Sequence, residues 1–138
     1  MPSYPKTKTA VTAGILILFV LDRFLKYGIF HQYFQEQFSL VGELFVFRPK
    51  INTGIAFSIP WPGEGLIVLI ILVILLLAVY GIHLGKKREY KHLFPVLALL
   101  LGATSNLVDR LQVGGVIDYL HIKYFSVFNI ADIMIVGG

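Results

Sequence analysis

Four apolar stretches dominate the pattern of hydrophobic and polar positions along the chain. They cover about residues 9–30, 65–85, 93–111 and 127–138. Crossing a bilayer takes about 20 mainly apolar residues in a helix, and the fourth stretch is too short to do so alone. It is either truncated or enters the membrane only part-way. The pattern therefore predicts four transmembrane helices, of which the fourth is short or truncated.

The segment between the first two stretches, about residues 31–64, has a different pattern. Strand-forming residues gather at Leu44–Phe47 and Ile55–Ile59, and Asn, Gly and Pro residues punctuate them. We expect a small extracytoplasmic β-cradle there, lying on the membrane surface. Residues 112–126 are expected to form a connection with a flexible Gly-Gly pair. The predicted fold class is thus an all-α membrane protein with a small β-cradle, a single domain over residues 1–138.

Composition and charge favour a membrane as the solvent for this fold. Hydrophobic residues make up 57% of the 138 residues and charged residues only 14%, whereas a soluble domain carries about 25% charged residues. Basic residues gather at Lys6, Lys8 and 86–91, beside apolar stretches, and such clusters face the cytoplasm. The N-terminus is therefore expected inside, and residues 31–64 and 112–126 outside. Because the net charge of +4 follows this membrane pattern, we do not expect a nucleic acid partner.

The chain has only four aspartates, and all lie in or beside apolar stretches near the predicted outer boundary: Asp22, Asp109, Asp118 and Asp132. An ionisable group at membrane depth is a candidate functional residue. Asp22 precedes Lys26 by one helical turn, so the two share a helix face. We interpret them as a structural ion pair in preference to a site for substrate or lipid head groups.

A second set of polar residues lies near the end of the third stretch. Asn106, Asp109 and Arg110 are spaced so that Asn106 shares a helix face with each of the other two. The guanidinium of Arg110 is suited to hold a carboxylate in a bidentate clamp. We expect this set to be scaffold rather than chemistry.

Asp118 and Asp132 carry the catalytic hypothesis. Asp132 lies three residues after Asn129 at the start of the last stretch, and Asp118 is predicted at the same depth. Two carboxyl groups a few Å apart cannot both ionise, so one keeps its proton at neutral pH. The ionised group activates water as a base and the protonated group polarises a carbonyl. This is the chemistry of an aspartic protease, and it requires neither metal nor cofactor.

Other catalytic patterns are absent from the sequence. Cysteine is missing, which excludes disulfides, thiol catalysis and Cys-ligated metals. Neither HExxH, GxSxG nor a glycine-rich phosphate loop occurs, the histidines lack metal-ligand spacing, and Ser105 has no evident base at its depth. An alternative from another class is a non-catalytic small membrane transport or channel subunit. It predicts acidic residues spread through the membrane depth, whereas the peptidase hypothesis predicts them gathered at one face.

Four short sequence blocks occur in order along nearly the whole length of the chain. They are Asp22-Arg23-Phe24-Leu25-Lys26, Asn52-Thr53-Gly54-Ile55-Ala56-Phe57-Ser58, Asn106-Leu107-Val108-Asp109-Arg110 with Gly115-Val116-Ile117-Asp118-Tyr119, and Phe128-Asn129-Ile130-Ala131-Asp132. Together they resemble the lipoprotein signal peptidases, or signal peptidase II. The resemblance implies four transmembrane helices, a β-cradle, a short surface helix, and Asp118 and Asp132 as the catalytic dyad. The residues that it implies to line or support the site are Asn52, Gly54, Asn106, Asp109, Arg110, Asn129 and Ala131, with Asp22 and Lys26 as a supporting pair.

The substrate implied by the resemblance is a bacterial prolipoprotein whose cysteine carries diacylglycerol. The enzyme would cut just before that cysteine, in the inner (cytoplasmic) membrane, with its active site near the outer face. Membrane lipids and globomycin-type inhibitors are the other implied partners, no metal or cofactor is implied, and a monomer is expected. Other intramembrane aspartic proteases carry a GxGD motif, whereas Gly115-Val116-Ile117 precede Asp118 here. Family members usually continue through a complete fourth helix, beyond the length that follows Asp132 in this sequence.

Overall fold

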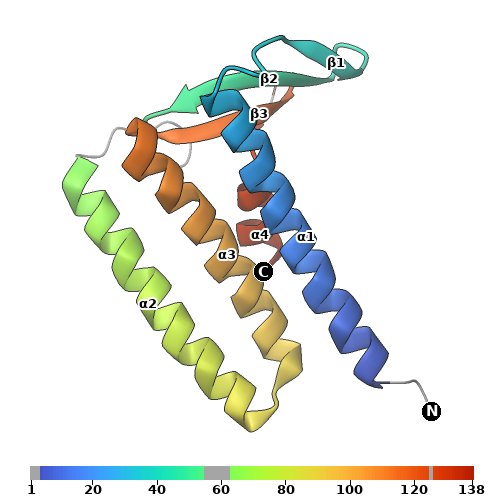
Figure 1. The fold of residues 1–138 in the computed structure, drawn as a ribbon, viewed down its shortest axis with the longest axis vertical. Coiled ribbons are helices and arrows are strands. Elements are labelled where there is room, and N and C mark those ends of the chain that lie inside the picture. Colours follow the sequence, from blue (N-terminus) through green and yellow to red (C-terminus); the bar gives the residue numbers. More distant parts are fainter. Residues whose placement is uncertain (1–3, 55–62, 125) are drawn as a thin grey trace.

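A computed structural model describes residues 4–54, 63–124 and 126–138. Figure 1 shows a bundle of helices with a small sheet across one end. The helices are α1 (Tyr4–Phe30), α2 (Gly63–Lys87), α3 (Tyr90–Val113) and α4 (Ile130–Gly137), and the strands are β1 (Phe38–Val41), β2 (Phe45–Asn52), β3 (Val116–Ile122) and β4 (Val127–Phe128). In the bundle, α3 packs against α1, α2 and α4.

Two of the helices have the length and apolar composition needed to cross a bilayer, namely α2 and α3. Apolar side chains of α2 remain exposed along the helix, among them Leu76 at 70% and Val79 at 67%. A large exposed apolar surface of this kind marks a membrane-facing element. The eight residues of α4 fall well short of the roughly 20 that a span requires. The number of transmembrane segments therefore stays a prediction.

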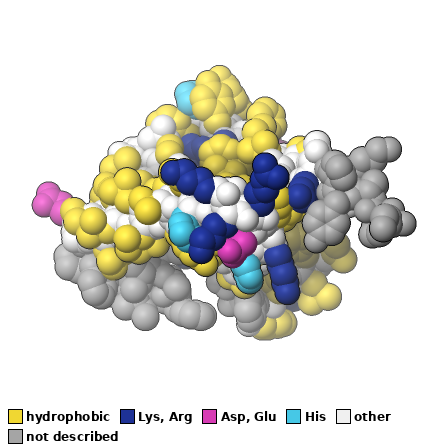
Figure 2. Space-filling view, turned by 90° about the horizontal axis from the view of Figure 1, so that it is seen from below, with side chains coloured by type: hydrophobic (Ala, Val, Ile, Leu, Met, Phe, Trp, Pro, Cys, Tyr) yellow, Lys and Arg dark blue, Asp and Glu magenta, His cyan; other side chains and the backbone are white. Residues whose placement is uncertain are grey.

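The end of the bundle opposite the sheet is basic. Figure 2 looks onto this end and shows Lys and Arg side chains gathered there, with few acidic ones. The last turn of α2 contributes Lys86 and Lys87, and Lys91 follows in the first turn of α3. The ammonium of Lys8 in α1 lies 3.6 Å from the ring centroid of Tyr90. Lys8 of the first basic cluster thus meets the second cluster at one end of the fold.

The sheet is antiparallel, with the strand order β1-β2-β3-β4. The register of β2 against β3 shifts between Phe47 and Lys50, where Arg48 and Pro49 face the single residue Tyr119. This is a β-bulge, and a bulge tolerates proline because an extra residue there is left out of the hydrogen-bond ladder. Bulges often occur next to active sites.

One apolar cluster ties the sheet to the helices. It contains Ile29 of α1, Phe47 and Tyr119 of the sheet, and Ile130 and Met134 of α4. The rings of Phe47 and Tyr119 lie 5.8 Å apart between centroids. Because the cluster joins α1, β2, β3 and α4, it fixes β3 and α4 at the same end of α1.

The strand β3 corrects the expectation that residues 112–126 form only a connection. Gly114 ends α3 in a left-handed conformation with a φ of 72°, and β-branched and aromatic residues then enter the sheet. The fourth helix also begins later than residue 127, because Val127–Phe128 form β4 and Asn129 caps α4. The term all-α therefore understates a sheet that has four strands.

Two further expectations concern the segment between α1 and α2. The strand predicted at Leu44–Phe47 is present as β2, which extends on to Asn52. The strand predicted at Ile55–Ile59 lies outside the described residues. Within the described ranges, α1 to α4 are the helices, and none of them corresponds to a short surface helix.

Candidate active site

The four aspartates come together in one hydrogen-bonded network at the sheet end of the bundle. Lys26 connects Asp22 with Asp109, at Nζ–Oδ2 distances of 3.0 and 2.8 Å. The same ammonium lies 2.7 Å from Oδ1 of Asn106, whose amide nitrogen lies 2.8 Å from Oδ1 of Asp132. The acids are gathered at one end, as the peptidase hypothesis predicts and the transport alternative does not.

The first part of this network is a buried ion-pair cluster. Asp22, Lys26 and Asp109 have fully buried side chains. Arg23 reaches Asp109 with an Nη1–Oδ1 distance of 2.7 Å and is 24% exposed. The predicted pairing of Asp22 with Lys26 is confirmed, but it is one half of a charge-balanced set of two acids and two bases. Balanced pairing is the condition under which buried charges are tolerated.

The carboxylate of Asp22 also fixes the elements that carry the dyad. Its Oδ1 accepts the hydroxyl of Tyr119 at 2.7 Å and the backbone N–H of Ala131 at 3.1 Å. Its Oδ2 accepts the hydroxyl of Ser105 at 2.5 Å. Since Tyr119 follows Asp118 and Ala131 precedes Asp132, one side chain of α1 holds both β3 and α4.

Asp109 has a similar bracing role on β3. Its Oδ2 accepts the backbone N–H of Ile117 at 3.2 Å, directly before Asp118. The expectation that Asp109 serves as scaffold agrees with these contacts, because both of its oxygens are occupied by Arg23, Lys26 and the strand.

Asn129 joins the two proposed catalytic carboxyl groups. It is the N-cap of α4, and its Oδ1 accepts the backbone N–H of Asp132 at 2.8 Å while Oδ2 of Asp132 accepts the backbone N–H of Asn129 at 3.2 Å. This reciprocal capping box starts the helix. The remaining end of the amide, Nδ2, donates to Oδ1 of Asp118 at 2.8 Å. Asp118 and Asp132 therefore contact one and the same residue.

A further amide approaches Asp118 from β2. Nδ2 of Asn52 lies 3.2 Å from Oδ2 of Asp118, and Oδ1 of Asn52 accepts the backbone N–H of Gly54 at 3.1 Å. A Cβ on Gly115 would lie 2.7 Å from the backbone oxygen of Asn52. The glycine thus permits the close approach of β2 and β3 that brings Asn52 to the acid.

Burial is the main cause of the pKa shifts of two neighbouring residues of β3, Asp118 and Tyr119. Burial, followed by the charge of Asp132, raises the pKa of Asp118 to about 6, against an ordinary value of 3.8. The carboxyl group is 2% exposed, and desolvation disfavours its charged form. Burial and the charge of Asp22 also raise the pKa of Tyr119, so its hydroxyl keeps the proton that it donates to Asp22.

Two expectations about α3 require correction. Arg110 does not clamp a carboxylate; its Nη1 and Nη2 lie 3.5 and 3.4 Å from the backbone oxygens of Asn106 and Gly54. Ser105 does have an acceptor, since its hydroxyl donates a hydrogen bond to Asp22, and Lys26 lies 3.4 Å from its oxygen. The serine is fully buried, so this arrangement is part of the packing between α1 and α3.

Sequence reasoning missed the parts played by Arg23 and Tyr119. The spacing of Arg23 and Lys26, three residues apart on one helix face, was the available signal for a second base beside the buried acids. No periodic signal marks Tyr119, whose partner Asp22 is 97 residues away in sequence. Among the described residues, no group of three or more His, Asp or Glu side chains could hold a metal ion.

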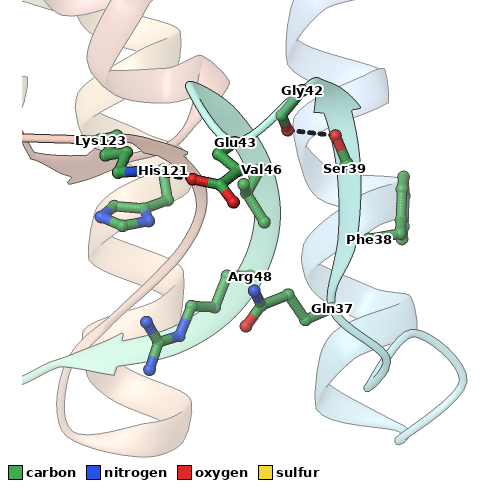
Figure 3. Close-up of a pocket in the computed structure, with 9 residues that line it drawn as sticks. All are labelled: Gln37, Phe38, Ser39, Gly42, Glu43, Val46, Arg48, His121 and Lys123. Atoms are coloured by element: carbon green, nitrogen blue, oxygen red, sulfur yellow. Dashed lines mark hydrogen bonds and ion pairs between the residues drawn. The ribbon is translucent and has the colours of Figure 1, made fainter.

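A polar groove lies on the sheet, apart from this network. Figure 3 shows its side chains, with the ion pair of Glu43 and Lys123 at one edge. None of the candidate site residues lines it. The lining residues are Gln37, Phe38, Ser39, Gly42, Glu43, Val46, Arg48, His121 and Lys123.

Comparison with known proteins agrees with this geometry. Residues 14–138 match the family described as Signal peptidase (SPase) II. This chain belongs to that family. A lipoprotein signal peptidase of Caldicellulosiruptor bescii is 32% identical over 124 residues, which covers 90% of this chain and 81% of that protein. A lipoprotein signal peptidase of Moorella thermoacetica is 35% identical over 128 residues, with 89% and 83% coverage.

Solved structures show the same fold. A bacterial membrane enzyme determined by the in meso method at 2.3 Å resolution superposes with a TM-score of 0.73 at 20% sequence identity, covering 95% of this chain and 81% of that one. A second, at 1.9 Å resolution, gives 0.69 at 19% identity, with 95% and 86% coverage. This chain of the signal peptidase II family thus shares the fold of these membrane enzymes, a bundle of helices capped by a sheet.

Proposed function

We propose that this protein is an aspartic endopeptidase that removes signal peptides from diacylglyceryl-modified prolipoproteins, cutting just before the lipidated cysteine. The observation that carries the proposal is the meeting of Asp118 and Asp132 at Asn129. Membership of the signal peptidase II family and relatives that are named lipoprotein signal peptidase support the substrate class.

The chemistry uses the two carboxyl groups in complementary states. One carboxylate takes a proton from water, and the water oxygen forms a bond to the scissile carbonyl carbon. The other carboxyl group gives its proton to the carbonyl oxygen, so a neutral tetrahedral intermediate forms. When the C–N bond breaks, the proton held by the first carboxyl group passes to the leaving nitrogen, and one hydroxyl proton of the intermediate returns to the second carboxylate as the new carboxyl group forms. The side-chain amides of Asn52, Asn106 and Asn129 orient the acids.

The charge distribution supports a defined orientation in the membrane. The basic end formed by Lys8, Lys86, Lys87 and Lys91 (Figure 2) would face the cytoplasm. The sheet end, with the acid network, would then lie at the outer face of the inner membrane (Figure 1). The apolar signal peptide would lie among the helices, and the diacylglyceryl chains would lie in lipid beside them.

A gel-shift cleavage assay tests this function. The purified protein is mixed with a precursor that carries diacylglycerol on its cysteine, with the same precursor lacking the lipid as a control, each with and without globomycin. Cleavage of the lipidated precursor alone, and its loss with globomycin, is the expected result. Equal cleavage of both precursors, or no cleavage of either by folded protein, would contradict the proposed substrate.

A further inference from the structure

Asn106 lies between a buried cation and the proposed dyad. Its Oδ1 is 2.7 Å from Nζ of Lys26 and, more distantly, 3.3 Å from Nδ2 of Asn129, and its Nδ2 is 2.8 Å from Oδ1 of Asp132. An ammonium group has donors and no acceptor. Of the two possible orientations of the Asn106 amide, only the one with the carbonyl oxygen toward Lys26 is therefore favourable. The N–H₂ end of the amide is forced toward Asp132.

Lys26 is itself held in place by charges that do not belong to the dyad. Its fully buried ammonium contacts Asp22 and Asp109, and Arg23 also pairs with Asp109. The two bases balance the two acids, so the cluster needs no counter-charge from Asp118 or Asp132. The orientation of the Asn106 amide is thus fixed independently of the protonation state of the dyad.

The two members of the dyad have different surroundings. Asp132 is half-buried, occupies the first turn of α4 and accepts both the backbone N–H of Asn129 and the amide of Asn106. A helix N-terminus favours a negative charge. Asp118 is 2% exposed and lies in a strand, where burial disfavours the charged form. The environment therefore separates the roles of two chemically identical groups.

We propose, on the basis of the proposed function, that Lys26 is a positioning residue of the reaction. By holding the oxygen of Asn106 it aims a hydrogen-bond donor at Asp132 and keeps that carboxylate as the base that takes the proton from the attacking water. Asp118 then carries the proton that passes to the carbonyl oxygen. The pKa of Asp118, which burial raises to about 6, agrees with this division.

Other charges also face the dyad. The guanidinium of Arg110 interacts with Asp132 and, less strongly, with Asp118, and the charge of Lys26 also acts on Asp118. The charged groups at the sheet end of the elements around α4 include Asp22, Arg23 and Lys26 of α1, Asp109 and Arg110 of α3, and Asp118 of β3. Among these cations, Lys26 contacts the side-chain oxygen of Asn106, whereas Arg110 approaches its backbone oxygen.

A matched pair of variants tests the role of Lys26. The double variant Lys26→Met with Asp22→Asn removes one base and one acid, so the cluster stays balanced between Arg23 and Asp109. The control is Asp22→Asn alone, which loses the same carboxylate but keeps Lys26. We expect the acidic limb of the pH dependence of kcat/KM to lie about one pH unit higher in the double variant than in the control, whatever their absolute rates.

A residue that gives only structural support would change the rate without changing the pH of the acidic limb. The position of the acidic limb therefore distinguishes a positioning role from structural support. A folded double variant whose limb coincides with that of the control would overturn the role of Lys26. If Asp118→Asn and Asp132→Asn both retained turnover, the proposed function itself would fail. If both were inactive and the limb stayed fixed, only the role of Lys26 would be lost.

A second measurement does not depend on the double variant folding. Because the sequence contains four aspartates, protein labelled with ¹³C in the aspartate carboxyl groups gives four resonances, and single Asp→Asn variants assign them. We expect the signal of Asp118 to report the proton that is lost near pH 6. Assignment of that titration to Asp132 in the wild-type protein would reverse the roles and overturn the inference.

Discussion

Two pairs of aspartates lie at the same end of this bundle and are held in opposite ways. Asp22 and Asp109 are fully buried and contact the cations Lys26 and Arg23. Asp118 and Asp132 are held by asparagine amides, and in the described part of the chain no cation forms an ion pair with either. The same type of side chain therefore appears in two chemical settings at one end of the fold.

The difference separates support from chemistry. A carboxylate that bonds to a cation cannot accept a proton without leaving a buried charge unpaired, which is unfavourable. An amide donates to a carboxylate without adding charge, so the acid can exchange a proton while its neighbours stay in place. We infer that the ion-paired acids fix the positions of β3 and α4, whereas the amide-held acids are free to change their protonation state.

The largest expected effect comes from removing either amide-held acid. Asp118→Asn and Asp132→Asn should each lower kcat by about 10⁴-fold or more, the range seen when one member of a catalytic set is removed, because each carboxyl group has a distinct step. Turnover of the lipidated precursor measures this. Glu43→Gln is the control, since Glu43 has an 84% exposed side chain outside the network. Normal turnover in either dyad variant would contradict the assignment of the amide-held acids to the chemistry and of the ion-paired acids to support.

Asp109→Asn should lower the stability of the protein more than its catalytic rate. Breaking a buried ion pair by removing one partner costs about 3–5 kcal/mol, and here Lys26 would lose one of its two carboxylates. Thermal unfolding in detergent should record the decrease. Arg23→Gln serves as the milder comparison, because Arg23 is 24% exposed and Asp109 would still contact Lys26. An Asp109→Asn variant as stable as the wild type would mean that the cluster is not a structural support.

The pH dependence of protein stability should show the titration of the Asp118 carboxyl group. Its pKa of about 6 in the folded state exceeds the ordinary value of 3.8, so the folded protein binds more protons than the unfolded chain between these values. Stability therefore falls as the pH rises from about 4 to 6, by about 3 kcal/mol as an upper bound, and changes no further above that window. Melting temperatures of wild type and Asp118→Asn across pH 4–7 test this. The variant should lack this decrease, and parallel curves would contradict the assignment.

Much of the bundle could be predicted from the sequence because lipid imposes a strong constraint on helices. A helix that crosses the membrane must be long and apolar, so α2 and α3 are visible as uninterrupted runs. The pair Asp22 and Lys26 was predictable for a local reason, since four residues separate them on one helix. Contacts of this kind depend on spacing alone.

The remainder of the site depends on pairings between distant parts of the chain. The strand β3 was expected to be a connection, because its seven residues become a strand only when β2 supplies the partner. Arg110 is suited by its chemistry to clamp a carboxylate, but the fold presents two carbonyl oxygens to it instead. The hydrogen bond from Tyr119 to Asp22 joins β3 to α1, and nothing in the local sequence indicates it.

The smallest predicted effect concerns a residue with no chemistry of its own. A Cβ on Gly102 of α3 would lie 2.6 Å from the backbone oxygen of Ala131 and 2.9 Å from the side chain of Ile135, so Gly102→Ala must push α4 away from α3. Overpacking of this kind costs about 1–3 kcal/mol. Because Asp132 lies on α4 and receives its amide donor from α3, kcat should fall by about tenfold or more while Asp22 and Asp109 keep their ion pairs with Lys26 and Arg23. Gly14→Ala is the matched control, since nothing lies within 4 Å of the added carbon. Equal activity in the two alanine variants would show that the amide-held acids tolerate a displacement of α4, and the contrast between a fixed support and a finely positioned dyad would then be wrong.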